Sequence, residues 1–161
     1  MNEDSLEYQV KAAIDTLTSF DVVGVSVITD SEKATDDINA LWERFFKESI
    51  GQAVEHKQSD VIYAVYSDYE GDHTKPYRLT IGYRVAESND VLDTLHHVQV
   101  QANDYAILSA AGKQPQALIE TWKSVWESDL ERLYATDFEV YGPRFFEDGV
   151  NEVLVHIGVK S

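Results

Sequence analysis

Hydrophobic and polar positions along the chain follow two different periods, which alternate in a fixed order. Residues 22–28, Val-Val-Gly-Val-Ser-Val-Ile, are mostly β-branched and predict a strand. Apolar residues at helical spacing then predict an amphipathic helix, whose apolar face is formed by Ile38, Leu41, Trp42, Phe45, Phe46 and Ile50. Segments 61–66 and 77–85 are again typical of strands, and the polar stretch 68–76 between them predicts a loop. The first half therefore predicts the order strand, helix, strand, strand.

The second half of the chain repeats this order. Residues 97–108 predict a strand, with 105–108 as its firmest part. A second helical stripe follows, formed by Leu118, Ile119, Trp122, Val125, Trp126, Leu130 and Leu133. Segments 137–141 and 153–159 predict two further strands, joined by a loop over 142–149.

Matched aromatic positions indicate an internal duplication. Trp42 and Trp122 are 80 positions apart, and Tyr66 and Tyr141 are 75 positions apart. The same elements in the same order, with matched aromatic residues, favour a duplication over chance. We therefore predict an α+β fold of two strand-helix-strand-strand units related by a pseudo-twofold axis, with a mainly antiparallel sheet and helices on one face. The seam between the units is a natural place for a ligand cleft.

The length of 161 residues suits one domain with a substantial core. We predict a single domain over 1–161, whose repeats cover about 20–86 and about 97–160. Only about 20 residues precede the first strand, which is too few for a helix-turn-helix domain. No DNA-binding domain is therefore expected in this chain.

The charge balance argues against nucleic acid as a direct partner. The chain has 13 basic and 29 acidic residues, a formal net charge of −16, and its Lys and Arg are scattered singly. A duplex-binding surface normally shows a basic patch. An acidic protein attracts cationic ligands or basic protein surfaces, and the charge also serves simply for solubility. The absence of cysteine excludes disulfides, thiolate metal sites and a cysteine nucleophile.

The ends and apolar runs of the sequence show no targeting signal. The first five residues are acidic where a signal peptide carries basic residues. No apolar run approaches the roughly 18 residues of a membrane helix. A cytoplasmic protein without a membrane partner is expected.

Glu139 is the first candidate for ligand chemistry. It lies in the middle of a predicted strand, where a carboxylate is unusual. Strand alternation places Asp137, Glu139 and Tyr141 on one face. Burying an unpaired carboxylate in an apolar cavity costs free energy. A cationic ligand that pairs with the carboxylate offsets this cost, so such a cavity would favour cationic ligands. The alternative is a glutamate on an exposed face of the sheet.

Aromatic residues complete the predicted site, since each ring can attract a cation with about 0.5–2 kcal/mol. Tyr66 and Tyr141 occupy the same place in the two repeats, so both should flank the seam. The further candidates are Tyr69 and Tyr105, on or beside strands, and Phe46, Trp122 and Trp126, on the helical stripes. The alternative for the helix aromatics is a purely structural role in the core.

Common catalytic and metal-binding motifs are missing from the sequence. The acidic segment 68–73 fails the calcium-loop pattern, because its sixth position is His73 where Gly is needed. No nucleophile elbow, phosphate-binding loop or zinc-protease motif is present. We expect no metal and no cofactor. If the protein has turnover, Glu139 would be the acid or base, with Tyr66 or Tyr141 orienting the ligand.

Seven short segments occur in an order that resembles the GyrI-like, or AraC-type effector-binding, family. They are Leu-Trp-Glu-Arg-Phe (41–45), Tyr-Ser-Asp-Tyr-Glu-Gly-Asp (66–72), Ile-Gly-Tyr-Arg-Val (81–85), Asp-Tyr-Ala (104–106), Trp-Lys-Ser-Val-Trp (122–126), Asp-Phe-Glu-Val-Tyr (137–141) and Ile-Gly-Val (157–159). The resemblance covers roughly residues 20–160. It implies a duplicated fold with a ligand pocket between the halves, in which Glu139 of the Asp-Phe-Glu-x-Tyr segment meets cationic ligands.

The resemblance also suggests what kind of relative this is. Many members are effector domains of multidrug-sensing transcription regulators, fused to a DNA-binding domain. The short N-terminal stretch makes this chain look like the standalone members, above all mobile-cassette (integron) proteins that bind cationic drugs.

Three functions therefore stay open at the level of sequence. The first is binding of small cationic or amphipathic aromatic molecules, as a sensor or sequestering protein. The second is hydrolysis of small reactive compounds in the same pocket, which some standalone relatives are reported to carry out. The third is an acidic protein-interaction or inhibitor module, which would have a protein partner.

Overall fold

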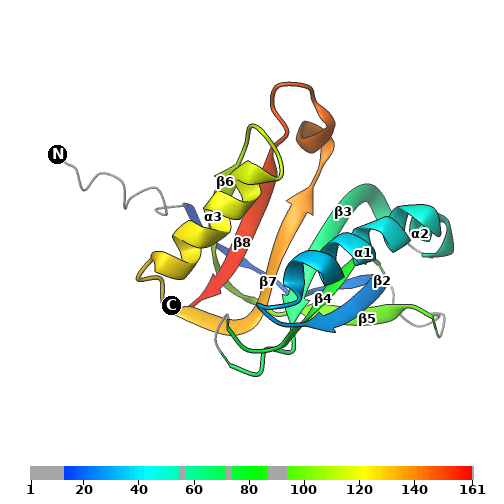
Figure 1. The fold of residues 1–161 in the computed structure, drawn as a ribbon. Coiled ribbons are helices and arrows are strands. Elements are labelled where there is room, and N and C mark those ends of the chain that lie inside the picture. The colour runs from blue at the N-terminus through cyan, green and yellow to red at the C-terminus, as the bar shows by residue number, and fades with distance from the viewer. Residues whose placement is uncertain (1–12, 55–56, 72–73, 87–93, 161) are drawn as a thin grey trace.

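In the computed structural model, which describes residues 13–54, 57–71, 74–86 and 94–160, the strands form one curved antiparallel sheet (Figure 1). The strands are β1 (Ala13–Leu17), β2 (Phe20–Thr29), β3 (Lys57–Ser67), β4 (Tyr77–Val85), β5 (His96–Val100), β6 (Asn103–Ala110), β7 (Arg132–Tyr141) and β8 (Val153–Val159). Their order is β1-β6-β8-β7-β3-β4-β2-β5, and each neighbouring pair is antiparallel.

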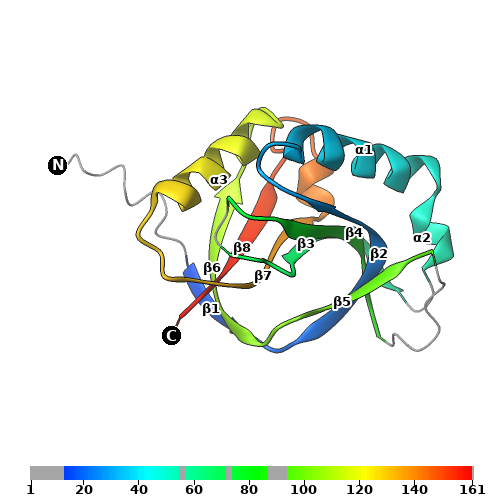
Figure 2. The same ribbon diagram turned by 60° about the horizontal axis from the view of Figure 1, so that its bottom comes forward.

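The helices lie together on one face of this sheet, as Figure 2 shows for α1 and α3. They are α1 (Ala34–Lys47), the single turn α2 (Ile50–Ala53) and α3 (Gln116–Glu127), and a short 3-10 helix, η2 (Pro143–Phe146), follows β7. This arrangement confirms the predicted α+β fold with helices on one face. None of the helices in the described ranges is long and apolar enough to cross a membrane.

The sheet order shows the duplication directly. The strands β5-β2-β4-β3 of one half meet the strands β7-β8-β6-β1 of the other, so that equivalent strands lie at equal distances from the centre. At the centre, Ala64 of β3 pairs with Glu139 of β7, and Tyr66 pairs with Asp137. Ala64 and Glu139 are themselves 75 positions apart, the spacing of Tyr66 and Tyr141. The pseudo-twofold axis therefore passes between Ala64 and Glu139.

The strand predicted over residues 97–108 is wrong in one respect, because the chain turns at residues 101–102 and forms two strands. β5 pairs with β2 of the first half, whereas β6 pairs with β8 and β1. Thr136 of β7 holds the corner, since its hydroxyl accepts a hydrogen bond from the backbone N–H of Gln101 at 3.0 Å. The Tyr105 hydroxyl donates to the carbonyl of Gln101 at 2.6 Å. This turn carries the chain from one half of the sheet to the other.

The second helix ends earlier than its apolar stripe predicts. α3 ends at Glu127, and the Ser128 hydroxyl donates to the carbonyl of Val125 at 2.7 Å. Leu130 and Leu133 lie beyond the helix, and β7 begins at Arg132 rather than at Asp137. Strand β7 is therefore long enough to place both an arginine and two carboxylates in the interior.

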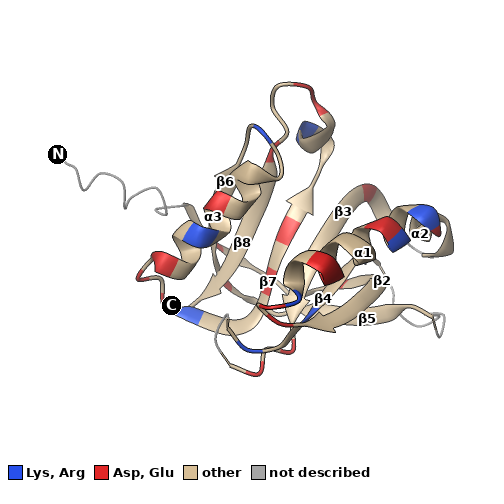
Figure 3. Ribbon diagram, viewed as in Figure 1, with Lys and Arg blue, Asp and Glu red and all other residues tan. Residues whose placement is uncertain are grey.

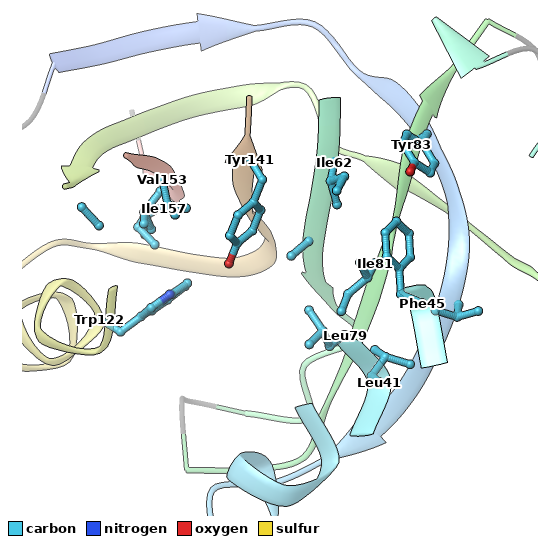
Figure 4. Packing of buried hydrophobic residues seen from close by; sticks show 14 of the residues in the cluster. Leu41, Phe45, Ile62, Leu79, Ile81, Tyr83, Trp122, Tyr141, Val153 and Ile157 are labelled. Carbon is cyan, nitrogen blue, oxygen red and sulfur yellow. The ribbon is translucent and has the colours of Figure 1, made fainter. Parts of the chain in front are cut away.

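Apolar side chains pack on both faces of the sheet. The larger cluster lies between the sheet and the helices, and in Figure 4 the rings of Trp122 and Tyr141 point toward one another within it. A smaller cluster on the other face includes Phe20, Tyr105 and Phe138. Phe138 and Glu139, which are neighbours in β7, thus face opposite sides, as strand alternation requires.

Candidate ligand-binding site

Glu139 is buried under the helices at the centre of the sheet, with an exposed fraction of 2%. Its Oε2 accepts hydrogen bonds from the Tyr66 hydroxyl at 2.9 Å and from the Trp122 indole N–H at 2.7 Å. Its Oε1 accepts one from the Tyr141 hydroxyl at 2.7 Å. Among the residues that the structure describes, no ion pair involves Glu139. The carboxylate therefore has hydrogen-bond donors but no countercharge.

The surroundings of Glu139 shift the pKa values of the groups that meet there. Burial raises the pKa of Glu139 above the ordinary glutamic acid value, and the hydrogen bonds from Tyr141, Trp122 and Tyr66 lower it in part. Burial and the Glu139 charge raise the pKa of both Tyr66 and Tyr141 well above the ordinary tyrosine value. Both hydroxyls therefore keep their protons and act only as donors to the carboxylate.

Four aromatic rings lie in two equivalent pairs, and three of them, those of Tyr66, Trp122 and Tyr141, belong to residues that donate hydrogen bonds to Glu139. Trp122 packs against Tyr66 with ring centroids 5.1 Å apart, and Trp42 packs against Tyr141 with centroids 5.0 Å apart. The pseudo-twofold relates one pair to the other, because Trp42 corresponds to Trp122 and Tyr141 to Tyr66. Trp42 and Tyr66 are half-buried, so part of each of these two residues reaches the surface. We call Glu139 and these four rings the Glu139 cage.

A second buried carboxylate, Asp137, lies two residues before Glu139 on the same face of β7. It is fully buried and forms an ion pair with Arg132, with 2.8 Å between Arg132 Nη2 and Asp137 Oδ2. The Tyr69 hydroxyl donates to the same oxygen at 2.5 Å, and the Gly158 backbone N–H donates to Oδ1 at 2.8 Å. The Arg132 guanidinium also lies 4.3 Å from the ring centroid of Tyr134. Asp137 is thus compensated, whereas Glu139 is not. Figure 3 marks acidic positions within β7.

The structure brings four of the predicted site residues together, namely Glu139, Tyr66, Tyr141 and Trp122. Tyr69 lies beside them, bound to Asp137. The spacing of the duplication identifies one residue that was not among the predicted site residues, Trp42, because it is the equivalent of Trp122. The Arg132–Asp137 pair was not foreseen.

Tyr105, Phe46 and Trp126 are placed differently from these residues. Tyr105 faces the other side of the sheet, where its ring contacts Phe138, because Ala106 rather than Tyr105 points toward the helices in this register. Phe46 is 60% exposed and stacks on Trp42. Trp126 is 46% exposed on α3. Phe46 therefore reaches the cage only through Trp42, and Tyr105 is separated from it by the sheet.

A depression of about 670 Å³ lies on the opposite face of the sheet and differs in chemistry. Its lining includes Ser67, His96, Gln101 and Thr136. Its one acidic group, Asp68, is exposed and pairs with Arg78. It offers no buried, uncompensated charge. Within the described ranges, no three His, Asp or Glu side chains are grouped so that they could hold a metal.

The raised pKa of Glu139 predicts how stability depends on pH. The folded protein holds the Glu139 proton more tightly than the unfolded chain does, so protonation favours folding. In the unfolded chain the pKa of a glutamic acid is about 4.3, and in the folded protein the pKa of Glu139 is higher. Relative to Glu139→Gln, the free energy of unfolding of the wild type should therefore fall as the pH rises from the unfolded-state pKa through the folded-state pKa, and then level off. Urea unfolding of both proteins between about pH 4 and 8 measures this difference. A difference that increases with pH contradicts the expectation.

Comparison with known proteins identifies the fold and the family. A family model described as integron-associated effector binding protein, Cass2, matches residues 13–157. YobU of Bacillus subtilis is 27% identical over 129 residues, which are 77% of this chain and 80% of YobU.

Solved structures give the same picture. The integron cassette protein VCH_CASS2 from the mobile metagenome of Vibrio cholerae superimposes with a TM-score of 0.73 at 25% identity, covering 93% of this chain and 96% of that protein. The structure of SAV2435 bound to tetraphenylphosphonium shares the fold with a TM-score of 0.74 at 18% identity, covering 93% and 94%. These matches confirm the resemblance to GyrI-like proteins that the sequence motifs indicate. The chain therefore belongs to the Cass2 family of integron-associated effector-binding proteins.

Proposed function

We propose that this protein binds small organic cations with aromatic or amphipathic character in the Glu139 cage, as a sensor or sequestering protein. The observation that carries the proposal is a buried carboxylate that accepts three hydrogen bonds from aromatic residues, with a fourth ring, Trp42, packed against one of them, and with no ion pair in the described part of the chain. Burial of an unpaired charge is costly, and a bound cation supplies the missing countercharge. The rings add cation–π attraction on the sides that the carboxylate does not face.

The rest of the molecule supports a cationic rather than an anionic ligand. The formal net charge is −16, and acidic residues occur along both α1 and α3 (Figure 3). Glu43 of α1 and Glu120 of α3 are exposed, so they contribute to the potential that an approaching ligand meets. The neighbour SAV2435, which shares the fold, is described with the organic cation tetraphenylphosphonium bound. That compound is therefore a rational first probe.

A matched pair of probes tests the proposal. Tetraphenylphosphonium and tetraphenylborate have nearly the same shape and opposite charge, so a comparison isolates electrostatics from apolar contact. We expect the cation to bind with a dissociation constant of about 10 μM or tighter, followed by calorimetry and tryptophan fluorescence, and the anion at least about 100-fold more weakly. Equal affinity for both ions would reject the charge mechanism, and no binding of a panel of organic cations would reject the function.

Hydrolysis of a small reactive compound is the second candidate. Its support is the raised pKa of Glu139 beside the hydroxyls of Tyr66 and Tyr141, an arrangement suited to proton transfer. Incubation with small electrophiles, followed by product analysis of the wild type and Glu139→Gln, tests this alternative. Turnover that depends on Glu139 would favour it over simple binding.

A further inference from the structure

Strand β7 offers two carboxylates to the same interior space. Asp137 and Glu139 are both buried, and alternation places them on one face of the strand, about 7 Å apart along it. Their equivalents in β3, by the 75-residue spacing, are Ile62 and Ala64, which carry no charge. The acidity of the interior therefore comes from one half of the duplicated fold. Two such carboxylates would suit a ligand with two positive centres.

Arg132 neutralises one of these two carboxylates, because it forms an ion pair with Asp137. Its guanidinium side chain is 4% exposed and lies 2.8 Å from the carboxylate. It lies among aromatic rings, with its centre 4.3 Å from the Tyr134 centroid, 5.9 Å from that of Trp122 and 6.0 Å from that of Tyr69. A carboxylate with rings around a cation is what the Glu139 cage offers to a ligand, but here the cation belongs to the protein.

Arg132 forms an ion pair through its charge but does not use all of its hydrogen-bond donors. Its Nε and Nη1 atoms are buried and have no hydrogen-bond partner in the described part of the chain. Buried donors of this kind are costly, and an apolar pair in place of the two charges would avoid the cost. Trp122 connects the two groups, because its ring lies near Arg132 and its N–H donates to Glu139.

We propose that Arg132 is a specificity-determining residue, which removes any preference of the Glu139 cage for a second positive charge on its ligand. The inference rests on the proposed function. With Arg132 in place, the two carboxylates and one guanidinium leave one uncompensated negative charge, at Glu139. A second cationic centre that reached toward Asp137 would meet a guanidinium of like charge at short range. The Arg132 guanidinium thus fills the place beside Asp137 that a second cationic centre of a ligand would otherwise take.

Two dyes that share a phenanthridinium ring test this inference. Ethidium carries one positive charge, and propidium carries a second one on an alkyl chain. Fluorescence titrations at about 0.5 M salt suppress long-range attraction, because the Debye length is then about 4 Å. We expect wild-type protein to bind the two dyes with affinities within about threefold of each other, and Arg132→Met to favour propidium by about tenfold more than the wild type does.

Two further variants control for structural damage. Arg132→Lys keeps the charge and should keep the wild-type ratio of the two affinities. Arg132→Met with Asp137→Leu removes both charges, and it should also keep that ratio, because only Glu139 remains.

The possible outcomes distinguish a failure of the inference about Arg132 from a failure of the proposed function. Wild-type protein that binds propidium more than about tenfold tighter than ethidium at high salt overturns the inference without any variant, even if Arg132→Met does not fold. Binding of ethidium by the wild type, with an unchanged ratio in a folded Arg132→Met, overturns the inference alone. If the wild type binds neither dye nor tetraphenylphosphonium, the proposed function fails and the inference fails with it.

Discussion

Replacing Glu139 by Gln is expected to weaken the binding of tetraphenylphosphonium by about 30-fold or more, because the only uncompensated buried charge of the cage disappears. The neutral amide keeps the size of the side chain. In the wild type, two hydroxyls and the Trp122 indole N–H all donate to the carboxylate. The NH₂ group of the glutamine is itself a donor, so it would face one of these donors and one hydrogen bond would be lost or reversed. Calorimetry on both proteins at equal salt gives the ratio of dissociation constants.

Two matched variants show which part of the effect is local charge. Glu43→Gln removes one acidic group from the exposed side of α1 and should change the affinity by less than about twofold, since exposed charges are screened. Tyr66→Phe keeps the carboxylate and removes one hydrogen bond to it, so a loss of less than about tenfold is expected. If Glu139→Gln and Glu43→Gln have equal effects, the cage is not where the cation binds.

The sequence carries enough information to predict the position of Glu139 because strand alternation is a strict rule. Once 137–141 is a strand, Glu139 must face the same side as Tyr141, and the duplication then brings Tyr66 to the matching position across the axis. The helical stripes likewise indicate that Trp122 faces the sheet, and it does so with 8% exposure. Local patterns and one repeat spacing were sufficient for these residues.

Other features depend on contacts that no local pattern encodes. Tyr105 belongs to a strand whose register places Ala106 toward the helices, and a shift of one residue reverses every side chain in a strand. The ion pair of Arg132 with Asp137 spans an irregular stretch of β7, where the pairing with β8 shifts between these two residues. Their spacing of five residues therefore matches no helix or strand rule. The turn at Gln101 depends on Thr136 of β7, which lies 35 residues later in the chain.

Removing Asp137 is expected to be the most destabilising single change among the polar residues of β7. Asp137→Ala leaves the buried Arg132 guanidinium without a countercharge and takes the acceptor from the Tyr69 hydroxyl and the Gly158 N–H. Breaking a buried ion pair by removing one partner typically costs about 3–5 kcal/mol, and we expect that loss in the free energy of unfolding. Urea unfolding followed by far-ultraviolet circular dichroism measures it.

The double change Arg132→Met with Asp137→Leu should be milder than Asp137→Ala by about 2 kcal/mol or more, because no charge stays buried without a partner, although the Tyr69 hydroxyl and the Gly158 N–H still lose their acceptor. If the double variant is instead as unstable as Asp137→Ala, the ion pair is needed for folding itself. A stable double variant has a different consequence. It would mean that Arg132 and Asp137 are replaceable as structural elements, although two donors of Arg132 are buried without partners. The reason for keeping both charges would then lie in the control of ligand charge beside Glu139.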